Sequence, residues 1–278
     1  MTPEPIDLQK AINAVSDVVQ NRPRPLREFD QIYMKTADMV LQSEFIAKWA
    51  AGKRLAFIGD GDAISVCVAY LHQRGILDYG PAATVVFDFD ERICNAVSRF
   101  AEKEGLTNLT AVLYNCLDPF PAPSQFDAFY TNPPWGASNA GESVKVFMQR
   151  GMEATGYGGD GVIVIADDPE LDWPKLVLAN VQRAALEAGF YVHRLMPEVH
   201  SYHLDDAPDL RSCNLVLRAM PGNARDNASA AITDPARIAN FYGRQAIPLV
   251  RYVRETARLD YGKANETEYG LELLEPPK

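Results

Sequence analysis

The pattern of hydrophobic and polar positions changes near residue 54. Before it, residues 1–20 and about 36–51 place apolar side chains on one face at helical spacing, which predicts two helices. Two X-Pro steps within residues 21–40 favour an extended connection between these helices. After residue 54, short apolar runs alternate with segments of helical periodicity. Such alternation is typical of a mostly parallel sheet with helices on both faces.

The alternation divides the chain into three parts, an N-terminal helical and extended segment (1–53), an α/β catalytic domain (54–220), and a linker with a C-terminal extension (221–278). In the extension we expect short helices and an acidic tail. The last two strands of the domain are expected to close the sheet, one of them antiparallel. The expected strands cover residues 54–62, 83–90, 109–118, 125–135, 160–168, 190–199 and 212–220, and the expected helices cover 63–75, 91–105, 142–155 and 174–189.

The composition indicates which kinds of binding partner to expect. The formal net charge is −10, which disfavours a protein held on nucleic acid by phosphate contacts and suits a cationic substrate. No N-terminal segment resembles a signal peptide, and no apolar run is long enough to span a bilayer. The four cysteines form no CxxC pair, which predicts reduced thiols and no metal site. We therefore expect a cytoplasmic protein without a membrane partner, and leave open whether it forms a homodimer.

Polar residues at the ends of the first three strands predict a nucleoside site. In "FIGDGD", Gly59 and Gly61 allow the backbone to approach a ligand at the start of a helix. Asp88 or Asp90 ends the second strand, where a carboxylate accepts from both ribose hydroxyls; we favour Asp88, because Asp90 also suits a helix N-cap. In "YNCLDPF", Asp118 is placed to meet an adenine amino group. The three strand ends together predict a site at the carboxyl edge of the sheet.

The fourth strand ends in "FDAFYTNPPWG" (126–136), which predicts an acceptor site for an amine. The prolines stiffen the loop and donate no hydrogen bonds of their own. The Asn132 side-chain oxygen and the Pro133 carbonyl can both accept from one –NH₂ group, and Trp135 can stack on a planar base or lie over a cation. This arrangement would aim a nitrogen lone pair at an electrophilic carbon.

The order of these motifs over about residues 54–220 resembles the S-adenosylmethionine-dependent transferase fold, which is Rossmann-like and of the class I methyltransferase type. In that superfamily the glycine turn and the acids of the second and third strands bind the donor. A strand ending in (Asp/Asn)-Pro-Pro-aromatic resembles the motif of enzymes that alkylate amino nitrogen. The resemblance implies a sulfonium donor and a nitrogen acceptor.

The segment "RPRPLREFDQIYMKT" (22–36), followed by "LAFIGDGDAIS", resembles the branched-chain polyamine synthase family, the N4-bis(aminopropyl)spermidine synthases. The resemblance implies transfer of an aminopropyl group from decarboxylated S-adenosylmethionine to a polyamine nitrogen. Two positions depart from the family's pattern: Gly61 replaces the middle acid of a Gly-Asp-Asp-Asp turn, and Asn132 replaces the acid before Pro-Pro. The family's proposed catalytic base, the last acid of that turn, corresponds to Asp62.

The resulting hypothesis is an aminopropyltransferase that uses decarboxylated S-adenosylmethionine, or S-adenosylmethionine itself, and no metal. The expected catalytic residues are Asp62, Asp60 and Asn132; the expected donor-binding residues are Gly59, Gly61, Asp88, Asp118 and Asn132; the expected polyamine-binding residues are Pro133, Trp135, Glu28, Asp30, Asp167 and Asp168.

Two alternatives stay open. Asn132 favours a neutral planar amine, which would make the protein an amino-N-methyltransferase of a nucleobase or an amide. The departures from the family's motifs would also suit a non-catalytic polyamine or nucleoside sensor. His200 and His203 lack a third ligand at a diagnostic spacing and are read as part of a polar loop rather than as a metal site.

Overall fold

The computed structural model describes residues 6–225, 228–243, 250–256 and 269–274. Seven strands form one sheet in the order β3-β2-β1-β4-β5-β7-β6, and β7 runs antiparallel to both of its neighbours. The predicted sheet, mostly parallel with an antiparallel closing strand, is confirmed. The strands are β1 (Arg54–Ile58), β2 (Ala83–Asp88), β3 (Leu109–Leu113), β4 (Ala128–Thr131), β5 (Asp160–Ala166), β6 (Phe190–Ser201) and β7 (Arg211–Ala219).

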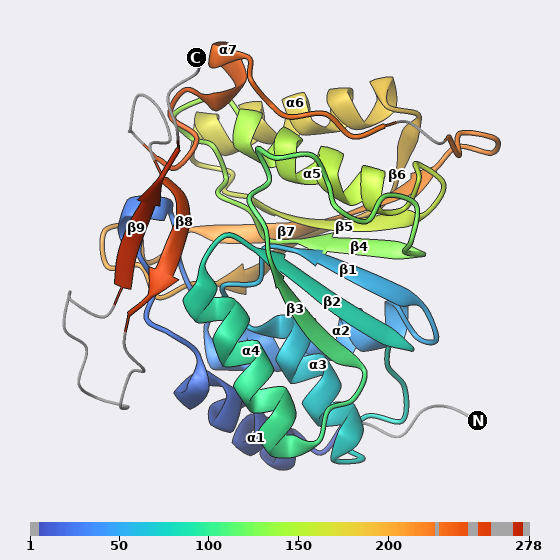
Figure 1. Cartoon of the computed structure of the whole chain (residues 1–278), viewed down its shortest axis with the longest axis vertical. Coiled ribbons are helices and arrows are strands. Elements are labelled where there is room, and N and C mark those ends of the chain that lie inside the picture. The colour runs from blue at the N-terminus through green and yellow to red at the C-terminus, as the bar shows by residue number, and fades with distance from the viewer. Residues whose placement is uncertain (1–5, 226–227, 244–249, 257–268, 275–278) are drawn as a thin grey trace.

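Helices cover both faces of the sheet (Figure 1). The strand pattern requires this, because Leu55 and Phe57 of β1 join one buried cluster while Ala56 and Ile58 join the other. The helices of the first face are α1 (Leu8–Asn21), α2 (Thr36–Trp49), α3 (Ile64–Gln73) and α4 (Glu91–Glu104), and those of the second are α5 (Glu142–Ala154) and α6 (Asp172–Glu187). The division of the chain into domains stays a prediction, and residues 1–5 of the first predicted helix lie outside the described residues.

The third and fourth strands are shorter than predicted. The fourth strand stops at Thr131 because the following segment contains two consecutive prolines, which have no N–H for the ladder. The third strand stops at Leu113, and its continuation turns where the Asn115 side chain accepts a hydrogen bond from the Leu117 amide at 2.9 Å. The residues beyond both strands are therefore free to form loops at the carboxyl edge of the sheet.

The C-terminal extension differs from the prediction. It has one short helix, α7 (Pro235–Ile238), but its other described elements are the strands β8 (Val250–Glu255) and β9 (Tyr269–Leu273), which pair as an antiparallel hairpin. The hairpin lies beside α4 in Figure 1. The Val253 amide donates to the Phe89 carbonyl at 3.1 Å, and Arg99 pairs with Glu255 at 2.9 Å. The extension is thereby fixed next to the end of β2. The end of the expected acidic tail lies outside the described residues.

Across the described ranges, no helix combines the length and the apolarity that crossing a bilayer requires.

Candidate active site

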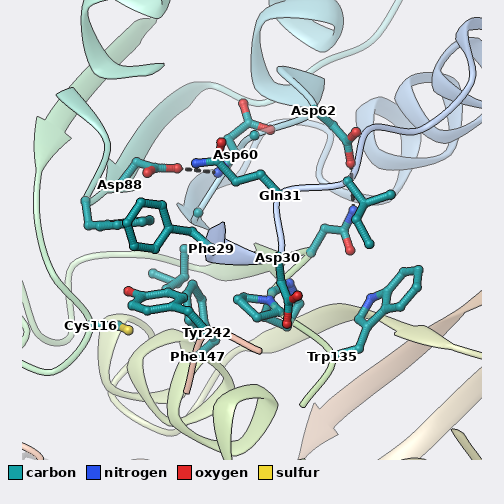
Figure 2. Close-up of a pocket in the computed structure, with 18 of the residues that line it drawn as sticks. Phe29, Asp30, Gln31, Asp60, Asp62, Asp88, Cys116, Trp135, Phe147 and Tyr242 are labelled. Carbon is teal, nitrogen blue, oxygen red and sulfur yellow. Dashed lines mark hydrogen bonds between the residues drawn. The ribbon is translucent and has the colours of Figure 1, made fainter. Parts of the chain in front are cut away.

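A cavity of about 200 Å³ lies at the carboxyl ends of β1, β2, β3 and β4. The N-terminal segment and the C-terminal extension complete its wall (Figure 2). Nine of the residues expected to form the site line this cavity. They are Asp30, Gly59, Asp60, Gly61, Asp62, Asp88, Asn132, Pro133 and Trp135.

The turn after β1 requires glycine at its first position. Gly59 has φ +75°, and a Cβ added there would lie 3.2 Å from the Phe147 ring. Asp60 then anchors the first turn of α3, because its carboxylate accepts from the Ile64 amide at 2.9 Å and from the Ser65 hydroxyl at 2.5 Å. Burial raises the pKa of Asp60 well above its usual range. Both Asp60 oxygens are therefore engaged in holding the turn on the helix.

Asp62 connects three separate parts of the chain. Its carboxylate accepts from the Met34 amide at 2.7 Å and from Asn132 Nδ2 at 2.6 Å, and Arg22 lies 4.0 Å away. Burial raises the pKa of the Asp62 carboxyl, and the Arg22 guanidinium offsets part of that shift. A carboxyl with a raised pKa that lines a cavity is suited to accept a proton from a bound amine.

Asn132 lies at one end of a buried polar cluster. Its amide donates to Asp62 and lies beside Tyr202, whose hydroxyl shares a 2.7 Å hydrogen bond with Ser212 Oγ. The same Ser212 oxygen lies 2.9 Å from His200 Nδ1, and His200 Nε2 lies 2.8 Å from Gln42 Oε1. Burial lowers the pKa of His200 to about 4, so its imidazole is neutral at neutral pH. The cluster restricts the orientation of the Asn132 amide.

Two aspartates at the end of β2 lie in different environments. Asp88 lines the cavity and accepts from the Asp60 amide at 3.0 Å and the Asp90 amide at 2.9 Å. Burial, and then the charge of Asp90, raise the pKa of Asp88 to about 7. Asp90 caps α4 and pairs with Arg92 at 2.5 Å, as expected of an N-cap residue. Asp88 is thus the acid of this strand end that faces the cavity.

Four residues expected at the site do not line the cavity. Asp118 pairs with Arg251 at 3.0 Å, and Glu28 accepts from the Tyr269 hydroxyl at 3.0 Å. The two remaining acids follow β5: Asp167 accepts from the Glu198 amide at 3.0 Å, and Asp168 accepts from an amide of its own loop.

Trp135 lines the cavity, and its ring is also in contact with another aromatic side chain. Its ring meets Tyr202 edge-on, with centroids 4.9 Å apart and planes at 84°. The indole is 8% exposed, and its N–H has no hydrogen-bond partner among the described residues. A ligand that enters the cavity could accept a hydrogen bond from this group.

Several cavity residues were missed at the sequence level. Gln31 and Tyr33 come from the segment that carried the family resemblance, and Gln31 Nε2 donates to Asp90 at 3.0 Å. The family resemblance of this segment was the feature of the sequence from which these two residues could have been predicted to line the site. Tyr114 and Tyr242 also line the cavity: Tyr114 begins the "YNCLDPF" stretch, from which only Asp118 was selected, and no local motif marks Tyr242.

The four cysteines are free and buried. Within the described part of the chain, no cluster of three or more His, Cys, Asp or Glu side chains could hold a metal ion.

A family model described as the C-terminal domain of branched-chain polyamine synthase A matches residues 10–261. N(4)-bis(aminopropyl)spermidine synthase of Thermococcus kodakarensis is 26% identical over 140 residues, which cover 49% of this chain and 37% of the relative. The protein of the same name from Methanocaldococcus jannaschii is 26% identical over 150 residues, which cover 52% of this chain and 40% of the relative. The match therefore spans less than half the length of these curated relatives.

Among solved structures, the branched-chain polyamine synthase from Thermus thermophilus has a TM-score of 0.68 at 22% identity, over 82% of this chain and 68% of that chain. That crystal structure contains N4-aminopropylspermidine and 5′-methylthioadenosine. The likeness shows a shared methyltransferase-type fold. Because the family model matches most of the sequence, this chain belongs to the family of branched-chain polyamine synthase A C-terminal domains.

Proposed function

We propose that this protein transfers an aminopropyl group from decarboxylated S-adenosylmethionine to a polyamine nitrogen. The observation that supports this most directly is the contact of Asp62 with Asn132 at the wall of the cavity. A carboxylate that can take a proton and an amide that can orient an amine meet there, as an N-alkylation requires. Membership in the family supports the same reaction.

The charge of the cavity supports a cationic acceptor and a donor without a carboxylate. Four aspartates line it, and no Lys, Arg or His is found among the lining residues that the structure describes. The decarboxylated donor ends in an ammonium group, which can donate hydrogen bonds to these acids and is attracted by those that are ionised, whereas the described lining offers no cation to pair with the carboxylate of S-adenosylmethionine. The four are Asp30, Asp60, Asp62 and Asp88.

In the proposed reaction the polyamine nitrogen attacks the propyl carbon bonded to the sulfonium sulfur. A C–N bond forms, the C–S bond breaks, and its electron pair stays on sulfur in 5′-methylthioadenosine. The Asp62 carboxylate receives the proton that the nitrogen loses. Gly59, Gly61 and Asp88 hold the nucleoside, and Asn132 with the Pro133 carbonyl orients the amine. Asp118 is not included, because it lies outside the lining and pairs with Arg251.

The test is to incubate the purified protein with spermidine and either decarboxylated or intact S-adenosylmethionine, and to measure product masses. We expect aminopropyl additions with the decarboxylated donor alone. Asp62→Asn should lower kcat about 10²–10⁴-fold, as loss of a general base does. Asp17→Asn, at an exposed site on α1, serves as the control and should retain full activity. Methyl additions would favour an N-methyltransferase, and ligand binding without any product would favour a sensor; either result would overturn the proposal.

A further inference from the structure

The segment 239–242 of the C-terminal extension is bound to the loop that follows the Asn-Pro-Pro-Trp motif and to the first turn of α5. Asn139 Nδ2 donates to the carbonyls of Ala239 and Asn240, both at 3.3 Å. The Ser143 hydroxyl donates to the Phe241 carbonyl at 2.6 Å. These three bonds fix the backbone of the segment, so the side chains it carries have defined positions.

Tyr242 inserts its ring into the wall of the cavity. The ring stacks on Phe89 with centroids 5.0 Å apart and planes at 18°, and it meets Phe29 edge-on at 5.5 Å. Phe89 follows Asp88 directly, so the C-terminal extension, the N-terminal segment and the end of β2 converge at this ring. Figure 2 shows Tyr242 on the side of the cavity where Asp88 and Cys116 lie, away from Asp62 and Trp135.

The Tyr242 hydroxyl is buried without a partner. The side chain is 2% exposed, and no described residue forms a hydrogen bond with its oxygen. A hydroxyl removed from water without a hydrogen bond costs roughly 1–3 kcal/mol. An aromatic residue needed only for packing would avoid this cost as phenylalanine. The Tyr130 hydroxyl is also buried without a hydrogen bond among the described residues, but only Tyr242 lines the cavity, and this position indicates that a bound molecule supplies the partner of its hydroxyl.

The position of the hydroxyl indicates which part of a ligand it meets. Asp62, which would receive the proton of the acceptor amine, lies at the other end of the cavity (Figure 2), and Asn132 donates a hydrogen bond to it. The Tyr242 end is formed by the ends of β2 and β3, including Asp88, Phe89 and Cys116. In an open α/β sheet with this topology, a nucleoside is expected at those strand ends.

We infer that the Tyr242 hydroxyl forms a hydrogen bond with the nucleoside part of the sulfonium donor, so that the C-terminal extension completes the donor site. The inference rests on the proposed function for the identity of the donor. The phenol can donate to a purine nitrogen or to a ribose oxygen. The extension then contributes directly to ligand binding and is more than a cover for the fold.

Isothermal titration calorimetry, which measures the Kd of 5′-methylthioadenosine for the full chain, tests this inference. Tyr242→Phe should raise Kd about 5- to 50-fold, as expected when a ligand atom loses a hydrogen-bond donor. The thermal midpoint of the ligand-free variant should not fall, because the hydroxyl has no partner in the described protein. Tyr130→Phe is the matched control: Tyr130 is equally buried but does not line the cavity, and its variant should bind as the wild type does.

The outcomes separate the inference from the proposed function. If the wild type binds and Tyr242→Phe binds equally well, the inference is wrong while the proposed function stands. An equal loss of affinity in Tyr130→Phe would show a general packing effect and would also overturn the inference. If the wild type does not bind 5′-methylthioadenosine at all, the proposed function fails and the inference fails with it.

Discussion

At the scale of single residues, Asp88 combines a fixed geometry with an unusual protonation state. Two backbone amides, from Asp60 and Asp90, hold its two oxygens in place. Those bonds favour the carboxylate, yet burial has the larger effect and raises the pKa to about 7. In the proposed donor site, the residue assigned to the ribose hydroxyls is thus only partly ionised in the free protein at neutral pH.

Donor binding should therefore depend on pH. In the proposed donor site the ribose hydroxyls donate to the Asp88 carboxylate, so binding would require loss of the Asp88 proton, and affinity should rise as pH increases through about 7. The Kd of 5′-methylthioadenosine should be about tenfold higher at pH 6 than at pH 8. Calorimetric titrations across this range provide the measurement, and Asp88→Asn should bind more weakly with little pH dependence. A wild-type Kd that stays constant from pH 6 to 8 would refute this role.

At the scale of elements, α5 packs on β4 through a glycine. A Cβ added at Gly151 would lie 2.1 Å from the Phe129 ring, and one added at Gly161 of β5 would lie 2.2 Å from the same ring. The aromatic ring thus fills the space that two missing side chains leave. This packing sets how closely α5 approaches the sheet, and α5 carries Phe147, which contacts the turn at Gly59.

Gly151→Ala should consequently lower the free energy of unfolding by about 1–3 kcal/mol, because the added methyl group overpacks a rigid contact. Urea denaturation measures the change. Phe129→Leu should also destabilise the protein, but the double variant should lose less than the sum of the two, since both act on one contact. Gly270→Ala is the control, because its added Cβ would meet nothing closer than 3.6 Å. Strict additivity of the two core changes would contradict the packing explanation.

Helices and strands could be predicted from the sequence where a local pattern of apolar residues determines them. The alternation of apolar runs and helical periodicity identified all seven strands of the main sheet, and its clearest apolar runs are those of the central strands β1, β4 and β5, which bury both of their faces under helices. The hairpin of β8 and β9 was missed because its anchors are distant in sequence. Arg254 pairs with Glu91 at 3.1 Å and with Glu272 at 2.7 Å, and no local periodicity reveals such pairs.

At the scale of the whole molecule, the site is built from segments far apart in the chain. The sequence indicated the strand-end residues because parallel strands bring their carboxyl ends to one edge. It could not show that Asp118 would be engaged by Arg251 of the extension, or that Tyr242 would reach the cavity. Both depend on how the extension packs, which is a property of tertiary structure and not of any local motif.

The acidic charge of the molecule should act on the acceptor and not on the neutral nucleoside. The net charge is −10, and four aspartates line the cavity, so a polyamine cation is attracted at long range and within the site. Raising NaCl from 50 to 500 mM should increase the KM for spermidine roughly 3- to 10-fold, since salt screens the long-range attraction between the net charge of the protein and the cation. The Kd of 5′-methylthioadenosine, which has no charge to screen, should change less than about twofold. Steady-state kinetics and calorimetry in the same buffers make the comparison. Equal salt dependence of the two quantities would indicate that salt acts on the protein as a whole, and the net charge of the protein would then have no specific part in attracting the acceptor.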